Sequence, residues 1–270
     1  MSEGLTEVRR VGIVANPNVG KECSEQLIEL LDKEGVEIER YTEPTGEREE
    51  NGDLDLIFVL GGDGTMLRAS RMYPGRVLLG VNLGTLGFMS GMRPEELESG
   101  VEKVLNGGVH VQEYRMLEVD VSGKEPENRM AVNDAALVKK HPHHITSVEL
   151  IVGGENLVTL RCDGFVAATP LGSTAYALSA GGPIVAGDVE CYVLVPIAPH
   201  SLLTRPLILG QDQIAELKVK EPGALLSLDG ADPEEIHAGE CVRFGLSNES
   251  VKIGRTDEWT WWRAVRNTFL

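Results

Sequence analysis

Apolar and polar positions along the first 110 residues predict strands and helices in alternation. Four segments have the short apolar or alternating character of strands, at residues 11–15, 36–41, 54–60 and 76–81. Three segments carry apolar side chains at helical spacing, at residues 23–31, 66–72 and 94–105. Because strands that alternate with helices form parallel sheets with helical crossovers, residues 1–110 are expected to form an α/β domain.

The pattern changes after a boundary near residues 109–114. Short strand-like segments follow, at residues 116–121, 131–138, 147–152, 156–162, 193–196, 215–219, 224–228 and 241–246. Such spacing with few helical windows predicts an all-β, sandwich-like domain over residues 111–250. Residues 251–270 hold all three tryptophans, at positions 259, 261 and 262, and are expected to pack back on the N-terminal domain.

The net charge of the chain restricts the range of partners and of source organisms that we expect. Asp and Glu number 42 against 25 Lys and Arg, which gives a formal net charge of −17. Such a surface repels nucleic acids and anionic membranes, so neither is expected as a partner. Dispersed acid with little Lys favours a halophilic archaeon, in whose cytoplasm dense salt screens the repulsion; an ordinary acidic protein is the alternative.

The cysteines and the N-terminus indicate a cytoplasmic protein. Cys23, Cys162, Cys191 and Cys241 lie far apart and predict isolated thiols in a reducing compartment rather than a zinc site or a disulfide framework. The opening MSEGLTEVRR has no apolar signal region, and no apolar run approaches the ~18 residues of a membrane span.

The first stretch with candidate chemistry is GGDGT at residues 61–65, directly after the strand predicted at residues 54–60. A glycine-rich turn between strand and helix leaves backbone N–H groups open to a phosphate. Asp63 would repel that phosphate, but it could take a proton from an attacking hydroxyl or bind Mg²⁺. The structural alternative is an ordinary turn in which Asp63 caps the helix.

Two further stretches carry polar groups in apolar surroundings. Residues 163–184 are rich in small residues and hydroxyls, which suits a loop that approaches a polar ligand, although a polar turn before a helix is equally compatible. Asn133 and Asp134 interrupt the apolar segment AVNDAALV and therefore need hydrogen-bond partners. A ribose diol would suit this pair, and a structural turn is the alternative.

Taken in order, these motifs resemble the NAD kinase family. The resemblance rests on GGDGT, the Asn-acidic pair and DG-x(5)-P-x-GSTAY-x-LSAGGP from Asp163, supported by GVNLG at residues 80–84 and PIAPHSLLTRP at residues 196–206. It extends from residue 11 to about residue 230. The long middle motif is specific, whereas lipid kinases and phosphofructokinases carry turns similar to GGDGT.

The resemblance implies roles for individual residues. It makes Asp63 the proton acceptor that activates the ribose 2′-hydroxyl. It also implies a nucleotide site formed by Asp63, Gly64, Arg68, Phe88, Asn133, Asp134, His144, Arg161, Asp163, Leu171, Thr174, Ala175, Tyr176, Ala177, Leu178 and Ser179, with no residue named as a metal ligand. Three positions depart from the family: Leu171 replaces the common Thr, Asp134 the common Glu, and Ala231 a polar side chain of some relatives.

The resemblance further implies the reaction and its partners. NAD would receive a phosphoryl group from ATP or polyphosphate with Mg²⁺ or another divalent metal, the dinucleotide would lie between the two domains, and the chain would form a homodimer or homotetramer. The alternatives are a diacylglycerol-type lipid kinase and a non-catalytic NADP sensor. The most basic stretch, KKHPHH at residues 139–144, is expected to bring His144 near the nucleotide, either within the subunit or across a subunit boundary. For Lys139 and Lys140 a solvated loop is favoured over direct contact with the nucleotide.

Overall fold

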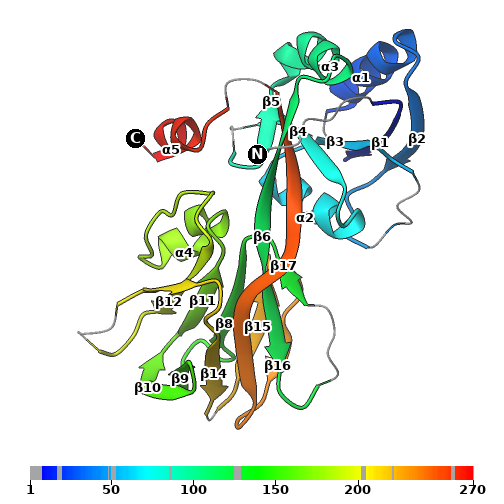
Figure 1. Cartoon of the computed structure of the whole chain (residues 1–270). Coiled ribbons are helices and arrows are strands. Elements are labelled where there is room, and N and C mark those ends of the chain that lie inside the picture. Colours follow the sequence, from blue (N-terminus) through cyan, green and yellow to red (C-terminus); the bar gives the residue numbers. More distant parts are fainter. Residues whose placement is uncertain are drawn as a thin grey trace. The chain divides into compact units, whose positions relative to one another are not determined.

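The chain divides into two compact units, which are described separately. Unit 1 comprises Met1–Glu113 and Val251–Leu270, and unit 2 comprises Tyr114–Ser250. Figure 1 draws the whole chain. This computed structural model describes residues 8–16, 20–47, 49, 53–84, 87–124, 129–201, 205–220, 222–256 and 259–269.

Unit 1 contains a parallel sheet with helices on both faces. Its strands are β1 (Arg10–Ala15), β2 (Glu37–Thr42), β3 (Leu56–Leu60), β4 (Val77–Val81), β5 (Ser90–Met92), the start of β6 (Val109–Val121) and the end of β17 (Cys241–Thr256). Its helices are α1 (Lys21–Lys33), α2 (Asp63–Met72), the short 3-10 turn η1 (Pro94–Glu96), α3 (Leu97–Leu105) and α5 (Trp261–Phe269). The sheet order is β2-β1-β3-β4-β17, and every one of these pairs is parallel.

Side-chain alternation assigns three helices of unit 1 to the two faces of this sheet. Leu56, Phe58 and Leu60 of β3 share a core cluster with apolar residues of α1 and α3. These two helices contact each other and lie side by side in Figure 1. Gly80 points to the opposite face, where a Cβ would lie 3.0 Å from the Met66 sulfur of α2. Helices α1 and α3 therefore cover one face and α2 covers the other.

Unit 2 is built from antiparallel strands. They are β7 (Met130–Ala131), β8 (Asp134–Lys139), β9 (Thr146–Val152), β10 (Glu155–Cys162), β11 (Gly164–Ala168), β12 (Cys191–Ile197), β13 (Leu207–Gly210), β14 (Ala215–Val219), β15 (Ala224–Leu228) and β16 (Glu234–Ile236), with the remainder of β6 and β17. One sheet contains β10-β9-β14-β17 with β6 and β7, and the other has the order β13-β12-β11-β8-β15-β16. Between them lies one cluster of buried side chains from both sheets, which makes unit 2 a sandwich.

The outer face of the six-stranded sheet carries the only α-helix assigned to the described part of unit 2. This is α4 (Tyr176–Ser179), preceded by the 3-10 turn η2 (Gly172–Thr174). Ala177 of α4 is fully buried with Val166, Ala168, Val193 and Val195 of β11 and β12. The turn and α4 are thus fixed over the sheet by apolar contacts, which positions their backbone near the first residues of β8.

The predicted fold class is confirmed, with differences in detail. The end of β17 was not predicted as a strand, and the segment predicted at residues 131–138 is broken into β7 and β8. The four cysteines are free thiols, three of them buried and Cys241 half-buried. No helix in the described part of the chain is long and apolar enough to cross a membrane.

Candidate active site

Four strands of unit 1 end at the same edge of the parallel sheet, and polar residues follow each of them. Asn16 follows β1, Glu43 follows β2, the GGDGT turn follows β3 and Asn82 follows β4. A pocket of approximately 380 Å³ opens here, lined by Asn16, Glu43, Pro44, Thr45 and Arg68. The carboxyl edge of a parallel α/β sheet is where such folds bind their ligands, so the predicted residue Arg68 faces a suitable opening.

The GGDGT turn leads from β3 into α2 without a side-chain cap. Gly61 approaches Thr65 so closely that a Cβ at position 61 would lie 2.3 Å from its hydroxyl oxygen. The N-cap of α2 is Gly62, which makes no side-chain cap hydrogen bond, and Asp63 is the first helical residue. The interpretation of Asp63 as a helix cap is therefore wrong. The N–H groups of Asp63 and Gly64 precede the first backbone hydrogen bond of the helix, which Thr65 donates to the carbonyl of Gly62 at 2.9 Å, and they can face a phosphate.

Asp63 instead binds the segment that precedes β5. Its two carboxylate oxygens accept hydrogen bonds from the backbone N–H groups of Phe88, at 2.9 Å, and Met89, at 3.1 Å. Gly87 lies against the carboxylate, since a Cβ there would come within 2.4 Å of all three of its heavy atoms. These contacts fix the plane of the carboxylate, and each oxygen keeps a second lone pair for another donor.

Phe88, a residue of the predicted nucleotide site, packs against aromatic rings of α5. Its ring centroid lies 5.0 Å from that of Trp261 and 5.8 Å from that of Phe269. Its carbonyl accepts a hydrogen bond of 2.5 Å from the buried guanidinium of Arg255, which also donates to the carbonyl of Ser90 at 2.8 Å. The Phe88–Ser90 segment is therefore held by Asp63 through its N–H groups and by Arg255 through its carbonyls.

In unit 2, Asn133 and Asp134 lie at the start of β8, where hydrogen bonds to Asp229 hold their backbone. The Asp229 carboxylate accepts hydrogen bonds from the N–H groups of Val132, Asn133 and Asp134, at 2.9, 2.7 and 3.1 Å. Burial, and secondarily the charge of Asp229, raises the pKa of Asp134 from 3.8 to about 7, although a hydrogen bond from the Tyr176 backbone lowers it. The side-chain oxygen of Asn133 is buried and accepts no hydrogen bond from a described residue.

A carboxylate with a raised pKa beside an unsatisfied amide costs folding free energy that a purely structural turn would not need to lose. Such groups concentrate at functional sites, where a ligand can supply the missing partners. This pair therefore favours the ligand-binding interpretation over the structural one.

The turn that precedes α4 is tied to the same residues. The hydroxyl of Thr169 donates to the carbonyl of Val132 at 2.7 Å and accepts the N–H of Gly172 at 3.1 Å. Gly172 lies so close to Asn133 that a Cβ would come within 2.0 Å of its carbonyl oxygen. The predicted residues on either side of Gly172, which are Leu171 and Thr174 to Ser179, therefore belong to a segment that begins beside Asn133 and Asp134. Among them Ala177 and Leu171 are buried, whereas Tyr176 and Ser179 are exposed.

Three other predicted residues of unit 2 make contacts elsewhere and not with Asn133, Asp134 or the turn before α4. Asp163 forms an ion pair of 2.8 Å with Lys139. Arg161 is exposed on β10, which is an edge strand. His144 is exposed in the turn after β8, where its ring lies edge-on to His141 with centroids 5.6 Å apart.

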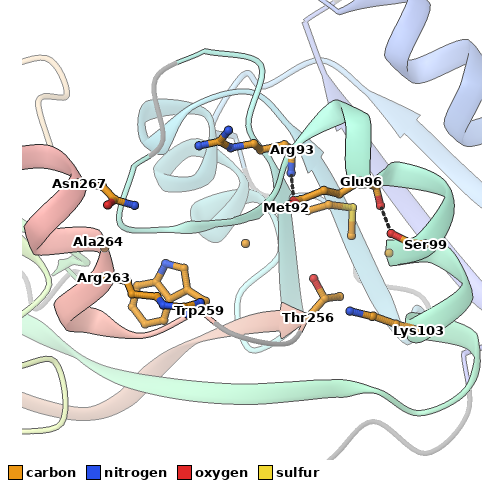
Figure 2. Close-up of a pocket in the computed structure, with 12 residues that line it drawn as sticks. Met92, Arg93, Glu96, Ser99, Lys103, Thr256, Trp259, Arg263, Ala264 and Asn267 are labelled. Carbon is orange, nitrogen blue, oxygen red and sulfur yellow. Dashed lines mark hydrogen bonds between the residues drawn. The ribbon is translucent and has the colours of Figure 1, made fainter.

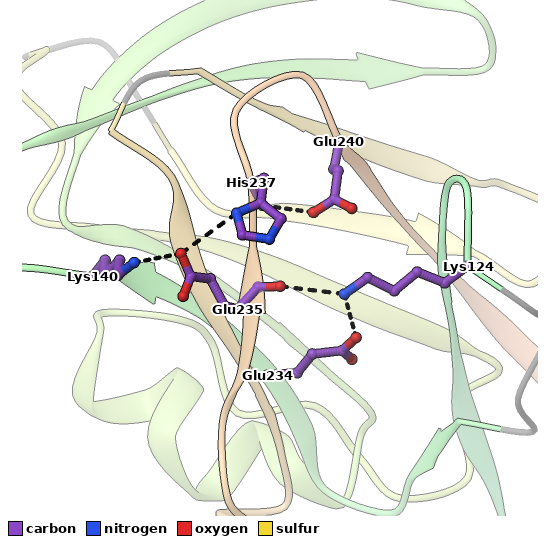
Figure 3. A network of polar contacts seen from close by, with 6 residues as sticks. All are labelled: Lys124, Lys140, Glu234, Glu235, His237 and Glu240. Atoms are coloured by element: carbon purple, nitrogen blue, oxygen red, sulfur yellow. Dashed lines mark hydrogen bonds and ion pairs between the residues drawn. The ribbon is translucent and has the colours of Figure 1, made fainter.

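The two lysines of the KKHPHH stretch are both paired within unit 2. Lys139 pairs with Asp163, and Lys140 pairs with Glu235 of β16. Figure 3 shows that Glu235 belongs to a network with Lys124, Glu234, His237 and Glu240. The hydrogen bond from Lys140 is the main reason why the pKa of Glu235 is lowered. These pairs give both lysines a structural role.

Comparison with known proteins identifies the family. The model of the ATP-NAD kinase N-terminal domain matches residues 13–109, and that of the ATP-NAD kinase C-terminal domain matches residues 132–256. The chain belongs to the NAD kinase family.

Similar proteins support this membership over nearly the whole length. An NAD kinase of Methanothermobacter thermautotrophicus is 35% identical over 97% of this chain and 96% of its own. One of Heliobacterium modesticaldum is 34% identical over 95% of this chain and 96% of its own. The chain is thus similar throughout to NAD kinases and shares their phosphotransferase activity, which sets aside the lipid kinase alternative.

Two solved NAD(H) kinase structures have the same fold. Yeast NADH kinase, complexed with NADH, superposes with a TM-score of 0.85 at 26% identity, over 97% of this chain and 88% of that one. An NAD kinase from Archaeoglobus fulgidus, in complex with ATP, gives a TM-score of 0.79 at 28% identity, over 96% of this chain and 97% of that one.

Within this NAD kinase fold, the sequence did not reveal two residues that position the site. Asp229, whose own φ is 49°, accepts hydrogen bonds from three consecutive N–H groups of the β7–β8 junction. The only feature of the sequence that pointed to this residue was an Asp-Gly pair after a strand-like segment. Arg255 is 3% exposed and holds the segment that binds Asp63. A buried arginine near the C-terminus carries no local signal of such a partner.

Proposed function

We propose that the chain transfers the terminal phosphoryl group of ATP or polyphosphate to the 2′-hydroxyl of the adenosine ribose of NAD, with Asp63 as the proton acceptor. The supporting observation is the Asp63 carboxylate, oriented by the N–H groups of Phe88 and Met89 at the carboxyl edge of a parallel sheet. Its placement suits proton abstraction, because both oxygens retain a lone pair while their plane is fixed.

The reaction is a direct displacement without a covalent enzyme intermediate. The 2′-oxygen forms a bond to the terminal phosphorus as the bond from that phosphorus to the bridging oxygen breaks, and the hydroxyl proton passes to a carboxylate oxygen of Asp63. The leaving group is ADP, or polyphosphate shortened by one phosphate. Catalysis of this kind depends on positioning and charge stabilisation.

The donor phosphates are proposed to lie against the first turn of α2, with Arg68 beside them. The amides of Asp63 and Gly64 supply N–H donors, and Arg68 supplies positive charge from the pocket that it lines. ATP is the donor suggested by the Archaeoglobus complex.

Mg²⁺ would reach the chain mainly on the donor phosphates. Among the described residues there is no group of three or more His, Cys, Asp or Glu side chains that could hold a metal ion. Mg²⁺ commonly binds through one or two carboxylates and substrate phosphates, so the free lone pairs of Asp63 fit such a role. When bound, the ion would neutralise charge on the transferred group.

The adenosine ribose of NAD is proposed to bind in unit 2. Asp134 can accept a ribose hydroxyl, and the buried side-chain oxygen of Asn133 can accept a second. The remaining contacts are proposed for Phe88, His144, Arg161, Asp163, Leu171, Thr174, Ala175, Tyr176, Ala177, Leu178 and Ser179. Leu171 brings no hydroxyl, so the neighbouring Thr174 and the backbone must supply polar contacts in its place.

Three properties of the cellular protein are also proposed. We infer a homodimer or homotetramer, because the edge strand β10 exposes Leu157 and Val158 and could pair with a second copy. We infer a cytoplasmic protein, because its four cysteines are free thiols, as is expected in a reducing compartment. The net charge of −17 supports a halophilic origin.

The test replaces Asp63 with Asn and follows NADP formation from NAD with ATP or polyphosphate. Loss of the proton acceptor is expected to lower kcat by about 10²- to 10⁴-fold, with the affinity for NAD kept within about tenfold. The amide of Asn can accept only one of the two N–H bonds, so stability should also fall, by roughly 1–3 kcal/mol. Asp32→Asn, on the exposed side of α1, is the matched control. Normal turnover of Asp63→Asn would refute the assignment, and no NADP from the wild-type chain would favour the sensor alternative.

A further inference from the structure

Strand β4 changes its pairing partner along its length, and Arg255 lies where the change occurs. The start of β4 pairs with β17, with Leu78 opposite Ile253, and its continuation pairs with β5, with Gly80 opposite Ser90. Arg255 follows Ile253 by two residues and is buried. A side chain of β17 can therefore reach the backbone of β5 at this point.

The guanidinium of Arg255 binds two carbonyls at the start of β5. It donates to the carbonyl of Phe88 at 2.5 Å and to the carbonyl of Ser90 at 2.8 Å. A planar guanidinium suits two acceptors at once, because its N–H groups point in fixed directions. The two bonds therefore fix the directions of two carbonyls that lie two residues apart.

One of these carbonyls shares a peptide group with a donor to Asp63. The carbonyl of Phe88 and the N–H of Met89 belong to the same peptide group, whose planarity fixes one direction relative to the other. The N–H of Met89 donates to the Asp63 carboxylate at 3.1 Å. Arg255 and Asp63 thus bind the two ends of one peptide group, so a rotation that breaks the bond at one end weakens the bond at the other. A guanidinium also polarises the amide to which it donates, which makes its N–H a stronger donor.

The Arg255 side chain is itself packed between other groups. The ring of Trp259 lies against its guanidinium, with 3.7 Å from the guanidinium carbon to the ring centroid. Gly91 of β5 comes so close that a Cβ there would lie 3.5 Å from the Arg255 Cδ. Figure 2 shows that Trp259 lines a pocket of approximately 420 Å³ together with Met92 of β5 and Thr256 of β17. The C-terminal segment therefore contacts β5 beyond the two hydrogen bonds, which restricts the guanidinium to one place.

We propose that Arg255 is a positioning residue for phosphoryl transfer, which holds the peptide group between Phe88 and Met89 and, through it, the orientation of the Asp63 carboxylate. The inference rests on the proposed function, because Arg255 has this task only if Asp63 accepts the proton. A displacement of about 1 Å can cost about 10²-fold in rate, so kcat should respond to Arg255 although the substrates keep their own contacts.

The first test separates kcat from KM. Arg255→Met removes the donors and is expected to lower kcat about 10- to 100-fold, with the KM values for NAD and ATP kept within about threefold. Arg255→Lys keeps the charge but offers a single donor centre in place of the planar fork, so it should recover part of the lost kcat. Unchanged kcat in Arg255→Met, or a loss shared equally with KM, would overturn the positioning role.

Arg76→Gln is the matched control. Arg76 also donates to a backbone carbonyl of unit 1, that of Leu54 at 2.9 Å. These two residues precede β4 and β3, at the edge of the sheet opposite to Asp63. Arg76→Gln should therefore lower stability and leave kcat unchanged, and a kcat loss as large as that of Arg255→Met would show that any buried arginine of the unit has this effect.

Amide hydrogen exchange tests the contact to Asp63 without turnover. In Arg255→Met the N–H groups of Phe88 and Met89 should exchange about tenfold faster than in the wild type, relative to the amides of β3, which report on unfolding of the unit as a whole. If Arg255→Met does not fold, Arg255→Lys is measured in its place. Equal protection of both amides in wild type and variant would show that Arg255 does not hold the peptide group.

A double variant decides whether Arg255 acts through Asp63. In the Asp63→Asn background, Arg255→Met should lower the residual kcat by less than about threefold, because the group that Arg255 positions is already lost. The full loss in that background would overturn the inference and leave the proposed function intact. Normal turnover of Asp63→Asn alone would instead refute the proposed function, and the positioning role would fall with it.

Discussion

Replacement of Asp134 by Asn is expected to stabilise the protein at alkaline pH. Asp134 is 8% exposed and lies near the carboxylate of Asp229, so its charged form is disfavoured and its pKa rises from 3.8 to about 7. A raised folded-state pKa means that the folded chain retains a proton which the unfolded chain loses between about pH 4 and pH 7. The stability of the wild type therefore falls as pH rises through this window and levels off above it.

The size of the effect follows from the same values. A rise from 3.8 to about 7 corresponds to roughly 4 kcal/mol of free energy at pH 8, relative to a carboxyl with its ordinary pKa. Asn has nearly the same shape, keeps an acceptor for the Tyr176 N–H and carries no charge. Allowing for relaxation around the carboxylate, we expect a gain of about 2–4 kcal/mol in unfolding free energy at pH 8. Near pH 4 the gain should fall below about 1 kcal/mol, because Asp134 is then protonated in the folded state and partly protonated in the unfolded state.

The measurement is denaturant unfolding of the wild type and Asp134→Asn at several pH values from 4.5 to 8.5. Asp188→Asn is the matched control, since it removes a carboxylate from an exposed position of the same unit and should change stability little at any pH. An equal gain at pH 5 and pH 8, or no gain at pH 8, would show that Asp134 does not carry this strained charge. If Asp134 also binds the ribose, the stabilised variant should have a raised KM for NAD, which is the usual trade between function and stability.

Three further outcomes are expected. Asp229→Asn should lower the unfolding free energy by about 1–3 kcal/mol, because its side chain can no longer accept all three N–H bonds as a carboxylate. It should also move the pH transition attributed to Asp134 to lower pH. An unmoved transition would contradict the coupling of the two carboxyls. His144→Ala is expected to raise the KM for NAD several-fold with little change in kcat, as loss of a uniform binding contact does, and an unchanged KM at saturating donor would return the turn to a structural role. The melting temperature and the activity should rise between about 0.1 and 2 M KCl as counterions screen the charge of −17; full activity and the same melting temperature at low salt would refute adaptation to salt.

The sequence predicted unit 1 well where burial alone decides the structure. Strand β3 is fully buried on both faces, so its apolar run could be recognised without knowledge of its neighbours. The end of β17 was missed because its residues include Lys252 and Arg255, which do not resemble a buried strand. Arg255 can be buried there only because its guanidinium binds the carbonyls of Phe88 and Ser90 and stacks on Trp259. These partners are distant in sequence and leave no local pattern.

The candidate site shows the same limit in unit 2. Residues 131–138 were predicted as one strand because apolar residues lie on both sides of Asn133 and Asp134. Asp229 interrupts it by taking the N–H groups of Val132, Asn133 and Asp134, which would otherwise be available to a neighbouring strand. Motif resemblance named Asn133 and Asp134, but only the structure shows which residue orients them and why Asp134 has a raised pKa.

The contacts of the Phe88 segment suggest why the C-terminal strand and helix belong to unit 1. A carboxylate acting as a base must be held firmly enough to meet its substrate yet must keep a lone pair free. Asp63 achieves this by accepting only N–H bonds from a segment whose carbonyls are bound on their other side by Arg255, while Trp261 packs on the Phe88 ring. The end of β17 and α5 therefore stabilise the geometry of Asp63 without contributing a proposed substrate contact, and the orientation of this proposed catalytic residue depends on residues almost 200 positions away in the chain.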